Sequence, residues 1–85
     1  MILNYGRIAI SLREHRTKNG MTQEQVSLAL GVSKGTVSMI ETGYIRKLEY
    51  LLWYIVQFDI PLDEMKGWYD HGCEEDFNGY QEDLS

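Results

Sequence analysis

Two short segments with helical apolar spacing are joined by only three residues, Gly31-Val32-Ser33, near the middle of the chain. The first segment opens at Thr22, whose hydroxyl suits an N-cap, and Gln25 completes the pattern of a capping box. The glycine of the connection suits the end of the first helix, and its serine suits the cap of the second. A connection this short does not fit an antiparallel hairpin of two exposed helices. The spacing therefore predicts two short helices that cross steeply.

The residue types along this segment meet the requirements of a steep crossing. Ser27 is small, as it must be where the second helix crosses closely, and Gly31 tolerates a positive φ at the turn. The positions that should face inward are all apolar: Val26, Leu30, Val32, Val37 and Ile40. Because every requirement is met at once, the pattern predicts a helix-turn-helix over residues 23–40.

Helical spacing continues on both sides of this motif. Before it, Ile8 and Leu12 mark a helix that stops at Asn19-Gly20. After it, a fourth helix covers about residues 46–58, and Pro61 suits the first turn of a short fifth helix. We find no convincing strand pattern in residues 1–65, so we expect an all-α bundle of five helices.

Charge is distributed unevenly along the 85 residues, which are enough for one small domain. Residues 1–65 carry seven basic and seven acidic side chains, whereas residues 66–85 carry Lys66 against six acidic ones. The net charge of −5 therefore belongs to the tail and does not argue against nucleic-acid binding by the body. We expect a folded domain in residues 1–65 and an acidic, aromatic C-terminal extension in residues 66–85.

Residues able to support catalysis or metal binding are few. Cys73 is the only thiol, and His71 beside it has no second cysteine or histidine pair with which to form a zinc site. No catalytic constellation is present, so we expect no enzymatic activity, no metal and no cofactor.

The first residues do not form a signal peptide, and no apolar run reaches the roughly 20 residues of a membrane span. These features predict a soluble, cytoplasmic protein.

Residues 21–43 resemble the Xre family, the helix-turn-helix domains of the λ repressor and Cro type. The resemblance extends outward to Ile8 and Met65. It implies a λ-repressor-like bundle that binds double-stranded operator DNA, usually as a homodimer, with the second helix of the motif in the major groove.

The resemblance also places base-reading positions on the third helix, opposite its apolar face. Lys34 can donate to guanine O6 and N7, whereas Gly35 reads no base but lets the backbone approach closely. Met39 can only pack on a thymine methyl, so we expect DNA shape to supply part of the specificity. The expected base-reading residues are Lys34, Gly35, Thr36, Ser38 and Met39.

Phosphate contacts are expected from both ends of the motif, because such contacts set the register on DNA. Gln23 matches the family's phosphate contact at a helix start, where free backbone N–H groups also attract anions. Family members often have a proline in the loop after the third helix, and this chain has Tyr44-Ile45-Arg46-Lys47 instead. The expected phosphate contacts are Gln23, Ser33, Tyr44, Arg46 and Lys47.

Several of these residues have simpler roles as alternatives. Arg16 and Glu41 match a family pair that joins the first and third helices, and we assign them a structural role. His15 is expected to pack on its helix face rather than to act as a switch or ligand. A solvated surface side chain is the alternative for Lys34 and Met39.

The tail and the fourth helix supply candidates for an interface. Four aromatic side chains among the acids of residues 66–85 are unusual for a purely solvated segment. The tail is thus interpreted as an oligomerisation arm, a docking peptide for another protein, or a disordered segment that weakens non-specific DNA binding. In the fourth helix, Tyr54, Ile55 and Phe58 match inward positions of the family, which leaves two other aromatics for an interface. The expected interface residues are Tyr50, Trp53, Trp68, Tyr69, Phe77 and Tyr80.

The function expected from these features is that of a homodimeric transcriptional repressor on an inverted repeat. The alternative is an antitoxin-like or adaptor protein whose tail binds a protein partner, with DNA binding secondary.

Overall fold

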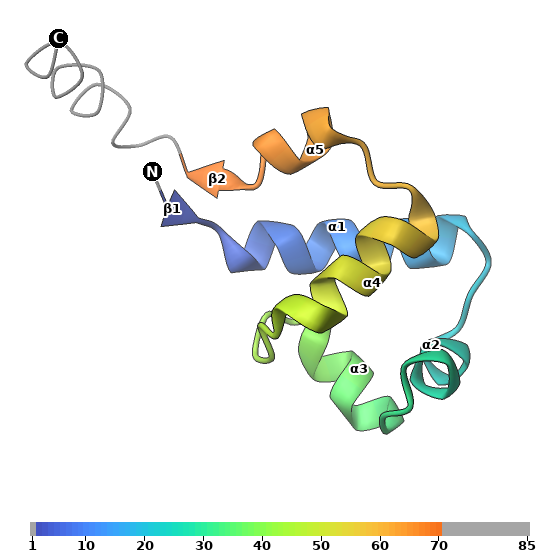
Figure 1. Ribbon diagram of the computed structural model, residues 1–85. Coiled ribbons are helices and arrows are strands. Elements are labelled where there is room, and N and C mark those ends of the chain that lie inside the picture. Colours follow the sequence, from blue (N-terminus) through green and yellow to red (C-terminus); the bar gives the residue numbers. More distant parts are fainter. Residues whose placement is uncertain (1, 71–85) are drawn as a thin grey trace, which may run out of the picture.

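The computed structural model describes residues 2–70. In chain order the elements are β1 (Ile2–Leu3), α1 (Tyr5–Lys18), α2 (Gln23–Leu30), α3 (Lys34–Ile40), α4 (Leu48–Phe58), α5 (Leu62–Lys66) and β2 (Tyr69–Asp70) (Figure 1). The five expected helices are confirmed. The proposed tail interactions of Phe77 and Tyr80, and the pair His71 and Cys73, lie outside the described residues.

The two helices of the motif begin and end with the local interactions that their sequence predicts. The Thr22 hydroxyl accepts from the Gln25 N–H at 3.1 Å, and the Gln25 side chain accepts from the Thr22 N–H at 2.8 Å. Gly31 ends α2 with a φ of 72°, and the Ser33 hydroxyl accepts from the Thr36 N–H at 3.1 Å to start α3. These caps fix the short turn between α2 and α3.

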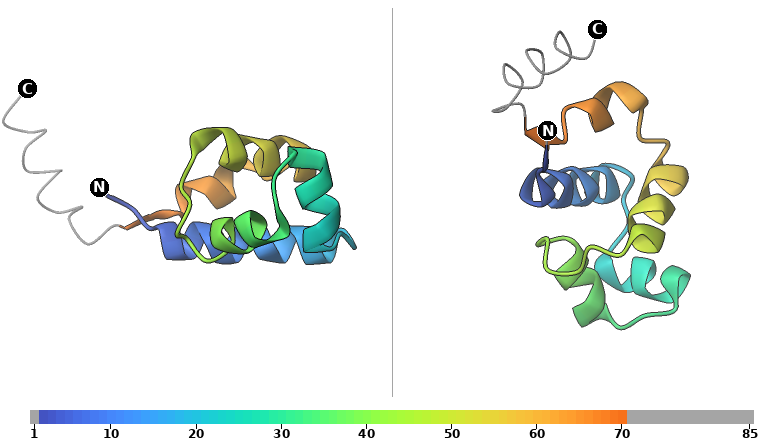
Figure 2. Two further views of the ribbon diagram at one scale, coloured as in Figure 1. Left: turned by 90° about the horizontal axis from the view of Figure 1, so that it is seen from below. Right: turned by 60° about the vertical axis from the view of Figure 1, so that its left-hand side comes forward.

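The helices surround a single apolar core. Figure 1 shows α2 and α3 below α1 and α4, with α5 above them. In the left view of Figure 2, α1 lies along one side of the bundle and α4 along the opposite side. The buried core side chains are Ile8, Leu12, Val26, Val37, Ile40, Tyr54, Phe58, Ile60 and Trp68. No helix among residues 2–70 has the length and apolar character needed to span a bilayer.

The two ends of the described chain form a short antiparallel ribbon, which corrects the expectation of no strand. Leu3 pairs with Tyr69, and Ile2 pairs with Asp70. The Asn4 N–H adds a bond of 2.8 Å to the carbonyl oxygen of residue 68. Two-residue strands are too short for a period-two pattern to be visible in the sequence.

Trp68 is only 6% exposed and belongs to the core, so its assignment to a dimer or partner interface is wrong. The boundary at residue 65 consequently falls too early, since the folded unit includes residues 66–70. Arg7 holds this segment in place by donating from Nη1 to the Gly67 carbonyl oxygen at 3.0 Å. In the sequence, Trp68 was grouped with the acidic residues of the tail. That composition gives no sign that the Trp68 side chain fills the end of the core.

A partly exposed carboxylate joins α5 to α1. Glu64 accepts from the Ser11 hydroxyl, and its two oxygens lie 2.8 and 2.9 Å from Nε2 of His15. Burial opposes ionisation of Glu64, but these hydrogen bonds and the nearby His15 and Lys18 outweigh it and lower the pKa of the carboxyl. His15 therefore does more than pack on the helix face, because it binds the carboxylate that holds α5.

Candidate nucleic-acid interface

Helix α3 has one buried face and one open face. Val37 and Ile40 are buried in the core, whereas Lys34, Gly35 and Met39 are exposed. Thr36 and Ser38 lie between these extremes and are half-buried. The exposed face continues into a shallow hollow at the start of α2, whose lining residues are Arg16, Met21, Thr22, Gln23, Glu24 and Lys34. The expected base-reading residues are thus all at least partly accessible.

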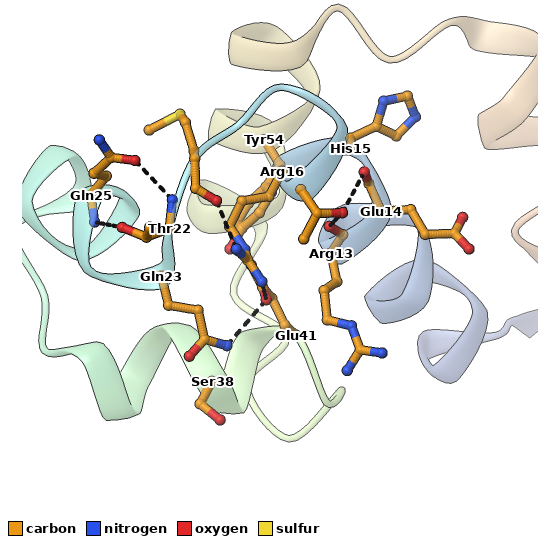
Figure 3. A network of polar contacts seen from close by, with 12 residues as sticks. Arg13, Glu14, His15, Arg16, Thr22, Gln23, Gln25, Ser38, Glu41 and Tyr54 are labelled. Carbon is orange, nitrogen blue, oxygen red and sulfur yellow. Dashed lines mark hydrogen bonds and ion pairs between the residues drawn. The ribbon is translucent and has the colours of Figure 1, made fainter.

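A buried carboxylate connects this face to the rest of the bundle (Figure 3). Arg16 donates to Glu41 twice, from Nε to Oε2 at 2.7 Å and from Nη2 to Oε1 at 3.0 Å. The Tyr54 hydroxyl donates to Oε2 at 2.7 Å, and Gln23 donates from Nε2 to Oε1 at 3.3 Å. Glu41 therefore ties α1, the start of α2 and α4 to the end of α3.

This polar cluster of Arg16, Gln23, Glu41 and Tyr54 fixes how α2 and α3 are presented. Burial, the hydrogen bond to Glu41 and the negative charge of Glu41 raise the pKa of the Tyr54 hydroxyl far above its ordinary value, so it remains a donor. Arg16 also donates from Nη1 to the Met21 carbonyl oxygen at 2.8 Å, which fixes the turn before α2. Fully satisfied buried networks hold neighbouring elements in one arrangement.

Tyr54 is the member of this cluster that sequence reasoning missed. It was expected only as an inward aromatic of α4. Its hydroxyl was the available signal, because a buried tyrosine needs a hydrogen-bond partner and Glu41 was already expected to join the first and third helices.

The first turn of α3 is closed by a side-chain hydrogen bond, and the space beside Gly35 is open. The hydroxyl oxygens of Ser33 and Thr36 lie 2.9 Å apart, so these two groups bond to each other across the first turn. A Cβ added at Gly35 would meet only the Ser33 hydroxyl, at an ordinary contact distance of 3.8 Å. Nothing in the folded chain therefore requires glycine at position 35.

The loop after α3 has a path set by a required glycine. Gly43 has a φ of 87°, and a Cβ there would come within 3.4 Å of the Tyr5 carbonyl oxygen. Arg46 donates from Nε to the Gly43 carbonyl oxygen at 2.9 Å, and its guanidinium lies 4.4 Å from the centre of the Tyr5 ring. Tyr44 is exposed, and so is Lys47, whose ammonium lies 3.9 Å from Glu49. The loop thus leaves Tyr44 exposed, keeps the exposed Lys47 beside Glu49 and Tyr50, and holds Arg46 against α1.

The helix-turn-helix family model matches residues 12–64 of the chain. This chain belongs to the Xre-type helix-turn-helix family. No curated protein and no solved structure matches it significantly. The family is one of DNA-binding regulators, and the matched range contains all four residues that meet at Glu41: Arg16, Gln23, Glu41 and Tyr54.

In this Xre-type domain, the two residues of α4 that the sequence assigns to an interface are partly covered by the core. Tyr50 and Trp53 are half-buried and pack against the core. The Trp53 ring lies edge-on to Tyr54, with ring centres 5.3 Å apart, and edge-on to Phe58 at 5.7 Å. Tyr69 is exposed on β2.

In residues 2–70, no group of three or more His, Cys, Asp or Glu side chains is arranged to hold a metal ion.

Proposed function

We propose that this protein is a sequence-specific transcriptional repressor that binds an inverted-repeat operator as a homodimer. The observation that carries the proposal is the open face of α3, which is held in a fixed orientation by the buried Glu41 cluster. A reading helix must keep its position relative to the phosphate contacts if it is to distinguish bases, and the cluster joins these two parts.

Base recognition in this proposal is poor in hydrogen-bond donors. Lys34, at the exposed start of α3, donates to guanine O6 and N7, a contact worth about 1–3 kcal/mol of discrimination. Met39 packs on a thymine methyl, and the half-buried Thr36 lies near the DNA backbone or a base edge. Gly35 allows close approach of the helix to the groove. DNA shape and deformability supply the remaining specificity.

Phosphate contacts flank the reading helix. Gln23 uses one amide N–H on Glu41, so its other N–H can donate to a phosphate beside the first-turn N–H groups of α2. Tyr44 and Lys47 contact the backbone from the loop after α3. Arg46 contributes its charge from its place over Tyr5. Repression follows from occlusion of a promoter, because the operator-bound dimer excludes other proteins from the same DNA.

The proposal is tested by selecting bound duplexes from a random-sequence pool with the full chain at about 150 mM salt. We expect enrichment of a palindrome whose half-sites lie about one helical turn apart. Lys18→Ala removes an exposed lysine from α1 and not from α3, so it is the control for a general loss of positive charge. This variant should enrich the same sequence as the unsubstituted chain. A pool in which no sequence is enriched, with the protein folded, would contradict sequence-specific binding.

A further inference from the structure

Arg13 is an exposed arginine of α1 whose side chain has no acidic partner among residues 2–70. The ion pairs of this part of the chain use other basic side chains: His15, Arg16, Lys47 and Lys66. The positions three and four residues away on α1, where a helical ion pair would form, hold no acid: they are Ala9, Ile10, Arg16 and Thr17. The Arg13 guanidinium is therefore a positive charge whose hydrogen-bond donors are all available.

The side of α1 that carries Arg13 packs against the end of α3. It is formed by residues that follow one another at helical spacing: Tyr5, Ala9, Arg13 and Arg16. At one end of this row Arg16 donates to Glu41, the residue that ends α3. At the other end the Tyr5 ring lies under the guanidinium of Arg46, which belongs to the loop after α3. We call this side of the helix the α3 flank of α1.

The figures place the α3 flank next to the exposed side of α3. In Figure 3, the Arg13 side chain lies to one side of Glu41, and those of Gln23 and Ser38 lie to the other. The left view of Figure 2 looks at the bundle from the side of α2 and α3, and α1 is visible there along the edge of the molecule. Arg13 is therefore positioned beside the candidate nucleic-acid interface and not on the far side of the bundle.

We infer that Arg13 binds a phosphate of the DNA backbone, so that the α3 flank of α1 is part of the DNA interface. The inference rests on the proposed function, which supplies DNA as the partner. An arginine guanidinium matches the geometry of a phosphate, because its planar donors can bind two oxygens at once. Arg16 uses Nε, Nη1 and Nη2 within the chain, whereas no group in residues 2–70 occupies the side chain of Arg13.

The position of Arg13 favours the backbone of the DNA over its bases. In the proposed complex α3 fills the major groove, and α1 lies behind and beside it. A side chain that reaches the DNA from beside the groove meets phosphate oxygens, which fix register but carry no sequence information. Arg46 is the second cation of the α3 flank, and its distance from Arg13 follows from α1. Tyr5 and Arg13 are eight residues apart, which is about 12 Å along the helix axis.

The test is the salt dependence of DNA binding by full-length variants. Fluorescence anisotropy would measure affinity between about 50 and 200 mM salt, because each phosphate contact releases counterions. In Arg13→Ala, the slope of log K against log salt should become shallower by about 0.9 for each bound copy. The same loss should be found on the selected duplex and on a duplex of unrelated sequence, since a phosphate contact weakens all sequences alike.

Two further variants separate a phosphate contact from a general effect of charge or folding. Lys18→Ala removes one positive charge from the opposite flank of α1, where Lys18 lies near Glu64, and it should keep the slope of the unsubstituted chain. Arg13→Lys keeps the charge and should keep most of the slope. Because Arg13 is exposed, both Arg13 variants should unfold at the same urea concentration as the unsubstituted chain. An unchanged slope in Arg13→Ala, or equal changes in Arg13→Ala and Lys18→Ala, would overturn the inference.

The inference and the proposed function can fail separately. A palindrome that is enriched, and is bound with the same salt dependence after Arg13→Ala, would overturn the Arg13 contact and leave the repressor standing. Binding that depends on Arg13 without enrichment of any sequence would support the Arg13 contact and contradict sequence-specific repression. A folded chain that binds neither duplex at the lowest salt concentration would contradict both.

Discussion

Two carboxylates join α1 to other helices, and they do so in opposite surroundings. The side chain of Glu41 is 1% exposed and accepts hydrogen bonds from α1, α2 and α4. The side chain of Glu64 is 34% exposed and is bound by two residues of α1 alone. The end of the molecule that carries α3 is therefore fixed by a buried network. The end that carries β1 and β2 is joined by a contact that is partly exposed to water and depends on pH.

Loss of the buried carboxylate is expected to have the largest effect. Glu41→Gln leaves the Arg16 charge buried without its partner, which costs about 3–5 kcal/mol of unfolding free energy. Urea unfolding measures the loss, and Glu14→Gln, at an exposed position of α1, should change stability by less than about 0.5 kcal/mol. A loss below about 1 kcal/mol for Glu41→Gln would show that Arg16 finds another partner.

Removal of the side chain that closes the terminal end comes next. Trp68→Ala should cost about 3 kcal/mol, because it empties a core position beyond the expected domain boundary. Tyr69→Ala is the neighbouring control, since Tyr69 is exposed, and it should cost less than about 1 kcal/mol. Equal losses in the two variants would mean that Trp68 does not belong to the core.

Replacement of the exposed carboxylate should have a smaller effect that depends on pH. Glu64→Gln should cost about 1 kcal/mol at pH 7, because it weakens the bonds to Ser11 and His15. The pKa of Glu64 is lowered in the fold, so its stabilisation is present above the ordinary value of about 4.3 and is lost as pH falls below it. The stability difference between the two chains should therefore shrink between pH 5 and pH 3 in urea unfolding. A difference that does not change with pH would contradict an ionised Glu64.

The smallest effect on stability is expected at Gly35 of α3, with the opposite sign. Gly35→Ala should stabilise the free protein by up to about 1 kcal/mol, because the helix gains a better helix former in open space. DNA binding should nevertheless weaken by about tenfold, which is 1.4 kcal/mol, if the backbone approaches the groove closely. Gly6→Ala on α1 is the control, and its binding curve by fluorescence anisotropy should match that of the unsubstituted chain. Unchanged DNA binding by Gly35→Ala would remove the role assigned to this glycine.

The helix-turn-helix could be predicted from sequence because its signals are local. Thr22, Gln25, Gly31 and Ser33 each act within one turn of the backbone, and their types alone determine the caps and the turn. The apolar spacing then identified Val37 and Ile40 as the buried side of α3. The opposite side of the helix is therefore the open one.

The terminal ribbon and the outer face of α4 could not be predicted in this way. Trp68 is buried because α1, α5 and the ribbon meet around it, and no pattern within residues 66–70 contains that information. In α4, apolar residues occur on every side, so spacing did not separate the buried Tyr54 from the exposed Leu52. The Tyr54 contact to Glu41 likewise joins two helices whose packing only the fold determines.

Sequence reading by the open face of α3 is tested most directly with Lys34→Ala. Its binding, and that of the unsubstituted chain, would be measured on the selected operator and on duplexes in which each base pair is changed in turn. We expect the variant to lose its preference at one base pair of each half-site, a loss of about 1–3 kcal/mol, and to keep it elsewhere. A uniform loss of affinity across all duplexes would show that Lys34 contacts only phosphate and would contradict base reading at the start of α3.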